Sequence, residues 1–312
     1  MTDATSAPPP SAVRVSDEVT AALAEGRPVL ALESTILSHG LPAPRSIEVG
    51  LAAEETVRAA GAVPATIGVV GGTAVVGLSP GEIEHLCTAG DVVKVSVRDL
   101  PVATALGLDG GTTVAATAWL AHRAGIRVMS TGGLGGVHRG AGETFDESAD
   151  LPTLARTPIT LVSAGVKSIL DIRATLERLE TLNVPVVGYG TTRYPGFYVA
   201  DSGFRLDYRV DSPEQAAALA AARDAHGLEA AVLVANPVAT HRQLDPALHE
   251  RTLADALAAA DAAGVTGHDI TPFLLDFFQR ATGGASLEVN LEVYRGNVEL
   301  GARIAVAVAA RG

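Results

Sequence analysis

The chain has 312 residues, of which 47% are hydrophobic, so it can fill the core of one large domain or two small ones. Its net charge of −12 argues against binding along a nucleic-acid backbone, which needs clustered Lys and Arg. A lone cysteine, Cys87, allows no internal disulfide, and no apolar run approaches the roughly 20 residues that span a bilayer. We therefore expect a cytoplasmic protein whose partners include neither nucleic acid nor membrane.

Residues 1–13 contain no signal segment, and their Pro, Ser and Ala content predicts a disordered tail ahead of a single domain over residues 14–312. Short β-branched runs predict strands at 29–32, 66–70, 74–77, 92–97, 127–130, 159–163, 184–188 and 231–235. Alanine-rich stretches predict helices at 46–60, 111–124, 168–182, 213–225, 246–263, 272–281 and 286–310.

Apolar strands that alternate with helices imply a three-layer α/β/α domain around a mostly parallel sheet. Segment 66–77, with Gly71-Gly72 at its turn, predicts an inserted hairpin that makes the sheet mixed. Ligands of such sheets bind at the carboxyl ends of the strands. The polar residues there are Glu33, Lys94, Thr131, Lys167 and Asn236. We expect one carboxylate and both lysines to lie near a common edge.

The first segment with candidate catalytic residues is 31–42, in which Glu33 lies between an apolar strand and a loop rich in Ser, Thr and His. A half-buried carboxyl in that setting has its pKa raised enough to act as an acid. The alternative is a capping glutamate satisfied by loop amides. His39 in the same loop is expected to form hydrogen bonds within the loop rather than to act as a catalyst.

Segment 131–140 has four glycines between a predicted strand and the pair His138 and Arg139. Its backbone amides are predicted to wrap a phosphate or a sugar, against the alternative of an ordinary flexible connection. The spacing is that of neither a dinucleotide-binding fingerprint nor a P-loop.

In the segment that follows, Asp146 and Asp150 are four residues apart, and a helical turn would place both on one side. Hard oxygen ligands of this kind suit Mg²⁺ or Mn²⁺, although two acidic residues on a solvated turn are common.

Lys94 and Lys167 are the two lysines of the chain, against 21 arginines. Compositional bias is one explanation. The other is that an amine can lose its proton and attack carbon, which a guanidinium cannot do. Lys94 interrupts the apolar run 92–95, and Lys167 follows the small-residue turn 163–166. If a helix begins near Ser168, the positive end of its dipole disfavours the ammonium form of Lys167, as would a nearby Lys94.

Together these segments resemble the pseudouridine-5′-phosphate glycosidase family, also called indigoidine synthase A-like. The matching stretches are ALESTILSHGLPAP (31–44), PATIGVVGG (64–72), KVSVRDLP (94–101), GGTTVAAT (110–117), STGGLGGVHRGAGETFDESADL (130–151), SAGVKSILD (163–171), ETLNVPVVGYGT (180–191) and TPFLLDFFQRATGGASLEVNLEVYRGN (271–297). They follow one order from about residue 15 to residue 308. Val97 and Ser163 depart from the family pattern, which has a basic residue and a cysteine there, but neither is a proposed catalytic group.

The resemblance implies an indigoidine synthase A-like fold and the reversible hydrolysis of the C–C glycosidic bond of pseudouridine 5′-phosphate to uracil and ribose 5-phosphate. It also implies one Mn²⁺ per subunit, with other divalent cations as alternatives, and a homotrimer. By resemblance, Lys167 is the nucleophile, Glu33 the proton donor and Asp146 the metal ligand through waters. Substrate contacts are implied for Lys94, Val114 (through its backbone), Ser148, Ala149, Asp150, Thr131, His138 and Asn290.

The implied chemistry gives a reason for a lysine. An ordinary glycosidase protonates a leaving oxygen between two carboxylates, whereas here the leaving atom is a carbon of uracil without a lone pair. Two other functions stay open: a Schiff-base aldolase and a non-enzymatic binding protein, each acting on another sugar phosphate. The (β/α)₈ barrel common among such aldolases fits this strand order poorly, and a binding protein gives no reason for a lysine at a helix start.

Overall fold

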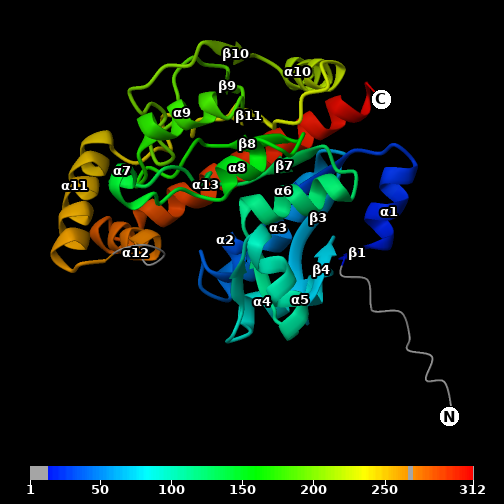
Figure 1. Ribbon diagram of the computed structural model, residues 1–312, viewed down its shortest axis with the longest axis horizontal. Helices are drawn as coiled ribbons and strands as arrows, with labels where there is room; N and C mark the ends of the chain where they lie inside the picture. The colour runs from blue at the N-terminus through cyan, green and yellow to red at the C-terminus, as the bar shows by residue number, and fades with distance from the viewer. Residues whose placement is uncertain (1–12, 266–269, 312) are drawn as a thin grey trace.

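The centre of the molecule is an 11-stranded sheet (Figure 1), seen in a computed structural model that describes residues 13–265 and 270–311. Its strands are β1 Val13–Val15, β2 Val29–Leu32, β3 Val63–Val70, β4 Thr73–Val76, β5 Val93–Val95, β6 Gly110–Thr112, β7 Val128–Ser130, β8 Thr160–Ser163, β9 Val186–Tyr189, β10 Tyr208–Val210 and β11 Val232–Ala235. Nine of them follow the order β1-β4-β3-β2-β7-β8-β11-β9-β10, and β5 and β6 branch from β3. The sheet is therefore open and is not a closed barrel.

The pairing is parallel except between β3 and β4 and between β3 and β6. The predicted mixed sheet and its hairpin are confirmed, with Gly71 and Gly72 at positive φ in the turn. The sequence prediction missed β1, β6 and β10, which are short and take their partners from distant parts of the chain. Val13 belongs to β1 and pairs with Ala74, so assigning it to the tail was wrong; residues 1–12 lie outside the described residues.

Helices cover both faces of the sheet. They are α1 Asp17–Ala24, α2 Thr35–Ser38, α3 Arg45–Ala59, α4 Pro80–Thr88, η1 Val97–Asp99, α5 Leu100–Leu106, α6 Val114–Arg123, α7 Ala141–Thr144, α8 Asp150–Leu154, α9 Ile172–Thr181, α10 Pro213–Ala225, α11 Pro246–Ala262, α12 Ile270–Ala281 and α13 Ala285–Ala309. Five predicted helices are confirmed to within about two residues, which corresponds to the usual uncertainty at helix ends: α3, α10, α11, α12 and α13.

Two predicted helices begin too early. Residues Gly110–Thr112 form β6, and α6 starts after Thr113, whose side chain accepts a hydrogen bond from the amide of Ala116. The helix predicted from Ser168 starts at Ile172, because Asp171 is its N-cap and accepts from the amide of Ala174 at 2.9 Å. An Asp that caps the backbone amides stabilises a helix start, and this one excludes Lys167 from the helix.

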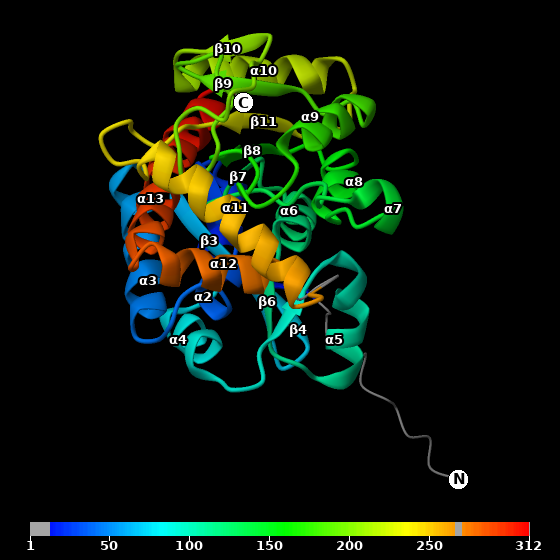
Figure 2. The ribbon, with the colours of Figure 1, turned by 90° about the vertical axis from the view of Figure 1, so that its left-hand side faces the viewer.

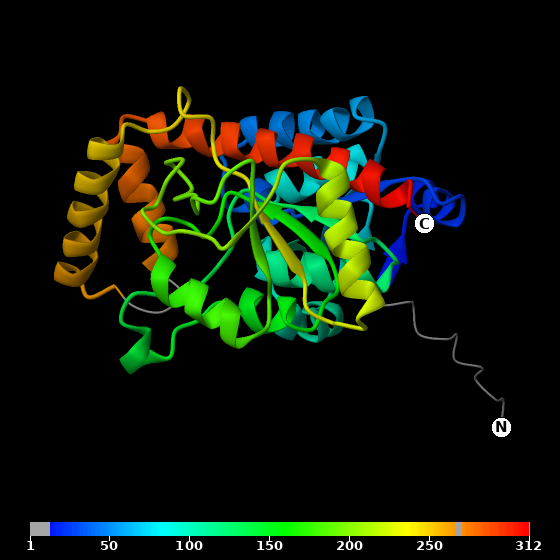
Figure 3. The same ribbon diagram turned by 90° about the horizontal axis from the view of Figure 1, so that it is seen from above.

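The strand β2 shows how the layers are joined. All four of its residues are buried, and their side chains alternate between the two faces. Leu30 and Leu32 pack in one cluster with residues of α3, α10 and α13, while Ala31 packs in another with residues of α1, α6 and α8. Figure 3 shows the sheet between these layers, with α13 running along the molecule.

The loops that follow the parallel strands gather at one end of the molecule. Figures 1 and 3 show α7, α11 and α12 at this end and the C-terminal end of α13 at the other. In the view of Figure 2, α11 and α12 lie in front of the strands. None of the helices in residues 13–265 and 270–311 combines the length and apolar character that crossing a membrane requires.

Candidate active site

Glu33, the first residue after β2, is the buried carboxyl of the site, with an exposed fraction of 7%. Burial raises its pKa, and the positive charge of Lys167 and a hydrogen bond from the Thr131 hydroxyl to Glu33 Oε1 offset part of this rise. The raised pKa predicted from the sequence is confirmed. The alternative of a capping glutamate is not confirmed, because the hydrogen bond that Glu33 accepts comes from the Thr131 hydroxyl and the N-cap of α2 is Ser34. A carboxyl with a raised pKa can donate a proton near neutral pH.

The residues next to Glu33 are held by a buried network of hydroxyl groups. Ser34 Oγ donates to the carbonyl of Ile67 at 2.6 Å and accepts from the amide of Thr112 at 2.9 Å. Thr112 Oγ1 also donates to Ile67 O, at 2.6 Å. Because every bond is made inside the protein, the ends of β2 and β6 are fixed relative to the middle of β3, and so is the backbone that carries Glu33.

Both lysines lie on the side of the sheet where Glu33 lies, as the sequence predicts. The charges of Lys167, Asp150 and Lys94 all act on the Glu33 carboxyl. Lys94, in β5, is exposed, yet its ammonium has enough protein around it that burial lowers its pKa, and the charge of Lys167 lowers it further. The cationic group of Lys94 therefore loses its proton more easily than a free lysine does.

Lys167 lies in a turn between β8 and α9 rather than at a helix start. Its amide donates to Leu134 O at 3.1 Å, and the amide of Leu134 donates to Gly165 O at 2.9 Å. The preceding amide, of Val166, donates to the hydroxyl oxygen of Tyr194 at 3.0 Å. The dipole argument made from the sequence is therefore wrong. The position of Lys167 is set by these bonds between loops, and its charged neighbours are Lys94 and Glu33.

In the glycine segment 131–140, three amides are not available for the predicted anion nest, because they donate hydrogen bonds within the protein. The amides of Leu134, Gly135 and Val137 donate to Gly165 O, Asp150 Oδ2 and Thr175 Oγ1. Close packing also requires at least two of the glycines. A Cβ on Gly133 would lie 2.6 Å from the Phe197 ring, and one on Gly136 would lie 2.4 Å from Thr175 Oγ1. Such distances leave no room for a side chain.

Asp146 and Asp150 do not share a helical turn, so this prediction is wrong as well. Asp150 opens α8, is 6% exposed, and accepts from the amides of Ala115 and Gly135 at 2.9 Å each. Asp146 lies before α8, with Oδ2 at 3.8 Å from His138 Nδ1 and about a third of its side chain exposed. One carboxylate therefore holds two loops together, and the other is available to a ligand.

The described residues contain no group of three or more His, Cys, Asp or Glu side chains that could hold a metal ion. Asp146 offers one half-exposed carboxylate, and the neighbouring His138 has its pKa lowered by burial. A hard cation retains several waters when few carboxylates bind it. Asp146 therefore fits a divalent ion that is held through waters and substrate oxygens, and does not fit a site built from protein ligands alone.

The other predicted contacts surround the same place. Val114 is the first residue of α6, directly before the Ala115 amide that binds Asp150. Ser148 Oγ accepts from the amide of Asp150 at 3.2 Å, and Ala149 is the N-cap of α8. Asn290, on α13, has its Oδ1 3.6 Å from where a Cβ on Gly132 would lie. The structure thus brings together the predicted substrate contacts. His39, by contrast, forms a hydrogen bond with Ser38 Oγ in its own loop, as expected, and a second one with the carbonyl of Val92, directly before β5.

Two residues of this region were missed from the sequence. Phe197 has a φ of 63° without being glycine, and its buried ring covers Gly133, beside the Lys167 side chain. Left-handed backbone at a bulky residue is often found at functional sites, but it has no sequence signal. Asn297, on α13, donates from Nδ2 to the carbonyls of Thr131 and Gly132. Its signal is its place seven residues after Asn290, on the same helix face.

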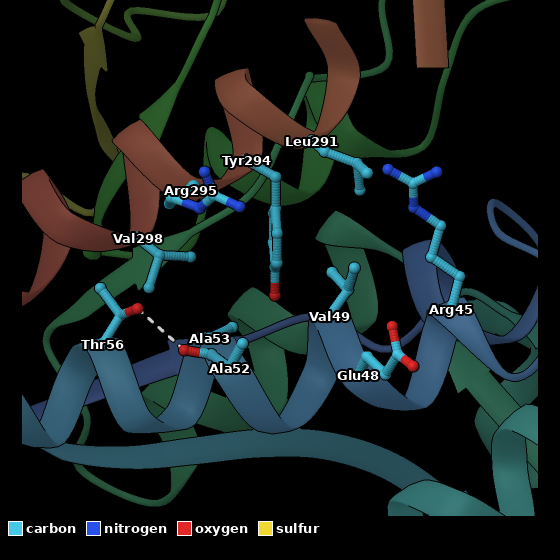
Figure 4. A pocket seen from close by; sticks show the side chains of 10 residues that line it. All are labelled: Arg45, Glu48, Val49, Ala52, Ala53, Thr56, Leu291, Tyr294, Arg295 and Val298. Carbon is cyan, nitrogen blue, oxygen red and sulfur yellow. Dashed lines mark hydrogen bonds between the residues drawn. The ribbon is translucent and has the colours of Figure 1, made fainter. Parts of the chain in front are cut away.

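A separate cavity of about 240 Å³ lies between α3 and α13 (Figure 4). Tyr294 reaches across it from α13 towards α3, while Arg45 and Glu48 stand on α3 at one end. Burial raises the pKa of Tyr294, and the charges of Glu33 and Glu54 raise it further. None of the predicted site residues lines this cavity, so it is a neighbour of the site and not the site itself.

The sequence model of indigoidine synthase A-like proteins matches residues 18–307. The pseudouridine-5′-phosphate glycosidase of Saccharopolyspora erythraea is 64% identical over 95% of this chain and 97% of that protein. The protein of the same name from Salinispora tropica is 62% identical over 94% and 91%. The structure of the prealnumycin C-glycosynthase AlnA in complex with ribulose 5-phosphate superposes with a TM-score of 0.89 at 40% identity, covering 96% of this chain and 97% of that one. An indigoidine synthase A-like protein from Thermotoga maritima superposes with a TM-score of 0.86 at 36% identity, covering 95% and 96%.

Proposed function

The chain belongs to the indigoidine synthase A-like family, and from this membership and its site we propose that it reversibly hydrolyses pseudouridine 5′-phosphate to uracil and ribose 5-phosphate. Relatives that carry this activity in their names are 58–64% identical over nearly the whole chain. The observation that carries the proposal is the buried Glu33, with its raised pKa, beside two lysines. A proton donor next to an amine is the pair of groups that this reaction needs.

In the proposed mechanism, Glu33 protonates the ring oxygen of the ribose while the neutral amine of Lys167 attacks C1′. The C1′–O bond breaks and the sugar opens. The nitrogen lone pair then forms a C=N bond as the bond from C1′ to the uracil carbon breaks, and that carbon takes up a proton. Water hydrolyses the imine, which releases ribose 5-phosphate and restores the amine. The burial of Glu33 supports its part because it raises the pKa of the carboxyl and so favours the protonated form.

Side chains beside the two catalytic residues would help to hold the anionic substrate. Lys94 and His138 are the basic groups beside the two catalytic residues, and Val114 begins a helix there. We propose that Asp146 holds Mn²⁺ through waters; when bound, this ion would supply positive charge against the substrate phosphate. We also propose a cytoplasmic homotrimer, which sedimentation of the purified protein can test.

The test of the function is incubation of the protein with uracil and ribose 5-phosphate, with chromatography to follow pseudouridine 5′-phosphate. Formation of this product supports the proposal, and its absence with Mn²⁺ present sinks it. Borohydride reduction with ribose 5-phosphate alone should leave an adduct on Lys167, located by peptide mass spectrometry. Lys167→Arg keeps the charge but should lose the adduct and turnover, while Lys94→Arg should keep the adduct. An adduct on Lys94 would refute the assigned roles.

A further inference from the structure

Asn297 is a buried amide that the proposed mechanism does not use. It lies on α13 with an exposed fraction of 1%. Its Nδ2 donates to Thr131 O at 2.8 Å and to Gly132 O at 3.0 Å, and its Oδ1 accepts from Asn236 Nδ2 at 2.9 Å. Both amide protons and the amide oxygen therefore have partners, and the two protons go to consecutive carbonyls of one loop.

The two carbonyls belong to the residues that follow β7, at the centre of the site. Thr131 is the residue whose hydroxyl donates to Glu33. Its own amide donates to Val162 O at 3.0 Å, so one side of its backbone is held by β8. Its carbonyl has Asn297 as its hydrogen-bond partner within the described residues, whereas Gly132 O also accepts from the amide of Ala164 at 3.0 Å. Asn297 thus holds the carbonyl side of the Thr131 backbone, as β8 holds its amide side.

The same amide connects four elements. Asn236, its partner on the other side, follows β11, and its backbone amide donates to Ser163 O at the end of β8 at 2.8 Å. The ends of β7, β8 and β11 are therefore tied to α13 through Asn297 and its partner Asn236. Next along the chain, a Cβ on Gly133 would lie 3.2 Å from Lys167 Cγ. A shift of the Thr131–Gly132 backbone would accordingly be felt at both proposed catalytic groups.

We propose that Asn297 is a positioning residue, which holds Thr131 in the orientation that lets its hydroxyl donate to Glu33. This inference rests on the proposed function, because it gives Glu33 a role as proton donor. A carboxylate gains more than a carboxylic acid from a donated hydrogen bond. Through Thr131, Asn297 thus adjusts how readily Glu33 releases its proton. The bond from Thr131 lowers the pKa of Glu33 against the larger effect of burial.

Three variants separate this role from a merely structural one. Asn297→Leu keeps the branching of the side chain, with a larger volume and no donor, and Asn297→Asp keeps the shape but loses the NH₂ group. Thr131→Val removes the hydroxyl itself and shows the effect of losing the hydrogen bond to Glu33 completely. Asn236→Ala is the matched control, because it removes the other partner of Asn297 and leaves both bonds to the loop. A cavity of about 480 Å³ lined by Asn236 and Asn297 lets water replace the lost donor in the control.

We expect the alkaline limb of the kcat profile to move to higher pH in Asn297→Leu, Asn297→Asp and Thr131→Val, since Glu33 acts in its protonated form and its pKa rises in all three. kcat should fall about tenfold, with little change in KM, because Glu33 is still present as the general acid but is no longer held in its orientation. Asn236→Ala should keep the wild-type profile. Folded Asn297 variants with an unchanged profile, or a rise in KM alone, would overturn the inference.

The same comparison can be made without turnover. Titration of the Glu33 side-chain carbon by NMR in the substrate-free protein, assigned with Glu33→Gln, should give a higher midpoint in the Asn297 variants than in wild type. Equal midpoints would overturn the inference even if the enzyme is active. A wild-type protein that forms no pseudouridine 5′-phosphate would instead refute the proposed function, and the NMR comparison would still decide the role of Asn297.

Discussion

Replacement of Gly135 by alanine tests whether the glycines of segment 131–140 are needed for packing or for binding an anion. A Cβ there would lie 2.3 Å from Ser148 Oγ and 2.7 Å from Asp150 Oδ2. Each of these atoms must move by roughly 1 Å to reach an ordinary contact. Overpacking of this kind costs about 1–3 kcal/mol. Asp150 is buried and bound to two backbone amides, and disturbing a hydrogen bond to a charged group costs about 1.5–3 kcal/mol more.

The free energy of unfolding of Gly135→Ala, measured by urea titration without substrate, should therefore fall by about 2.5–6 kcal/mol. The matched control is Gly142→Ala in α7, where a Cβ would meet nothing within 4 Å. Alanine favours helix, so this variant should be unchanged or up to about 1 kcal/mol more stable. If Gly135→Ala unfolds like wild type while its KM rises, the amide of Gly135 serves substrate binding and the packing argument fails.

Three further predictions concern single side chains. Burial raises the pKa of Glu33, so the protonated carboxyl contributes stability that is lost as the pH rises through the raised pKa. Glu33→Gln should be inactive, and it should become progressively more stable than wild type above pH 4.5. Parallel stability curves of the two proteins in urea titrations at several pH values would refute this. Tyr194→Phe leaves the buried amide of Val166 without its acceptor and should lower the free energy of unfolding by about 1–3 kcal/mol, with less adduct on Lys167; full stability in thermal unfolding would count against that bond. Asp146→Asn should weaken Mn²⁺ binding about 10- to 100-fold in calorimetry without substrate, and unchanged affinity would remove Asp146 from the metal site.

The sequence predicted the layers of the fold well because they follow from local patterns. Short runs rich in apolar and β-branched residues such as 159–163 favour strands buried on both faces, and long alanine-rich stretches such as Pro213–Ala225 are helices of the expected length. It failed at β1, β6 and β10, each three residues long. Gly110–Thr112 is a strand because β3 and β5 lie beside it, and no local propensity encodes such a partner.

The same division holds within the site. The positions of polar residues after or within predicted strands were enough to predict that Glu33, Lys94 and Lys167 lie together, because parallel strands end at one edge. Which groups those residues bind was not predictable. The amide of Gly135 binds Asp150 and Lys167 is set by its bonds to Leu134, and these are contacts between segments that pack against each other only in the folded chain.

The sequence by itself determined the α/β class and the family, and it singled out Glu33 and Lys167 as the proposed acid and amine, since these inferences depend on residue type and order along the chain. Only the tertiary structure decided what surrounds these two residues. It buries Glu33 and supplies the hydroxyl of Thr131, and it removes Lys167 from the helix dipole and places Asn297 behind the loop. The reason is physical, because a pKa and a hydrogen-bond partner depend on the solvent excluded and the groups within about 3 Å, and distant parts of the chain provide both.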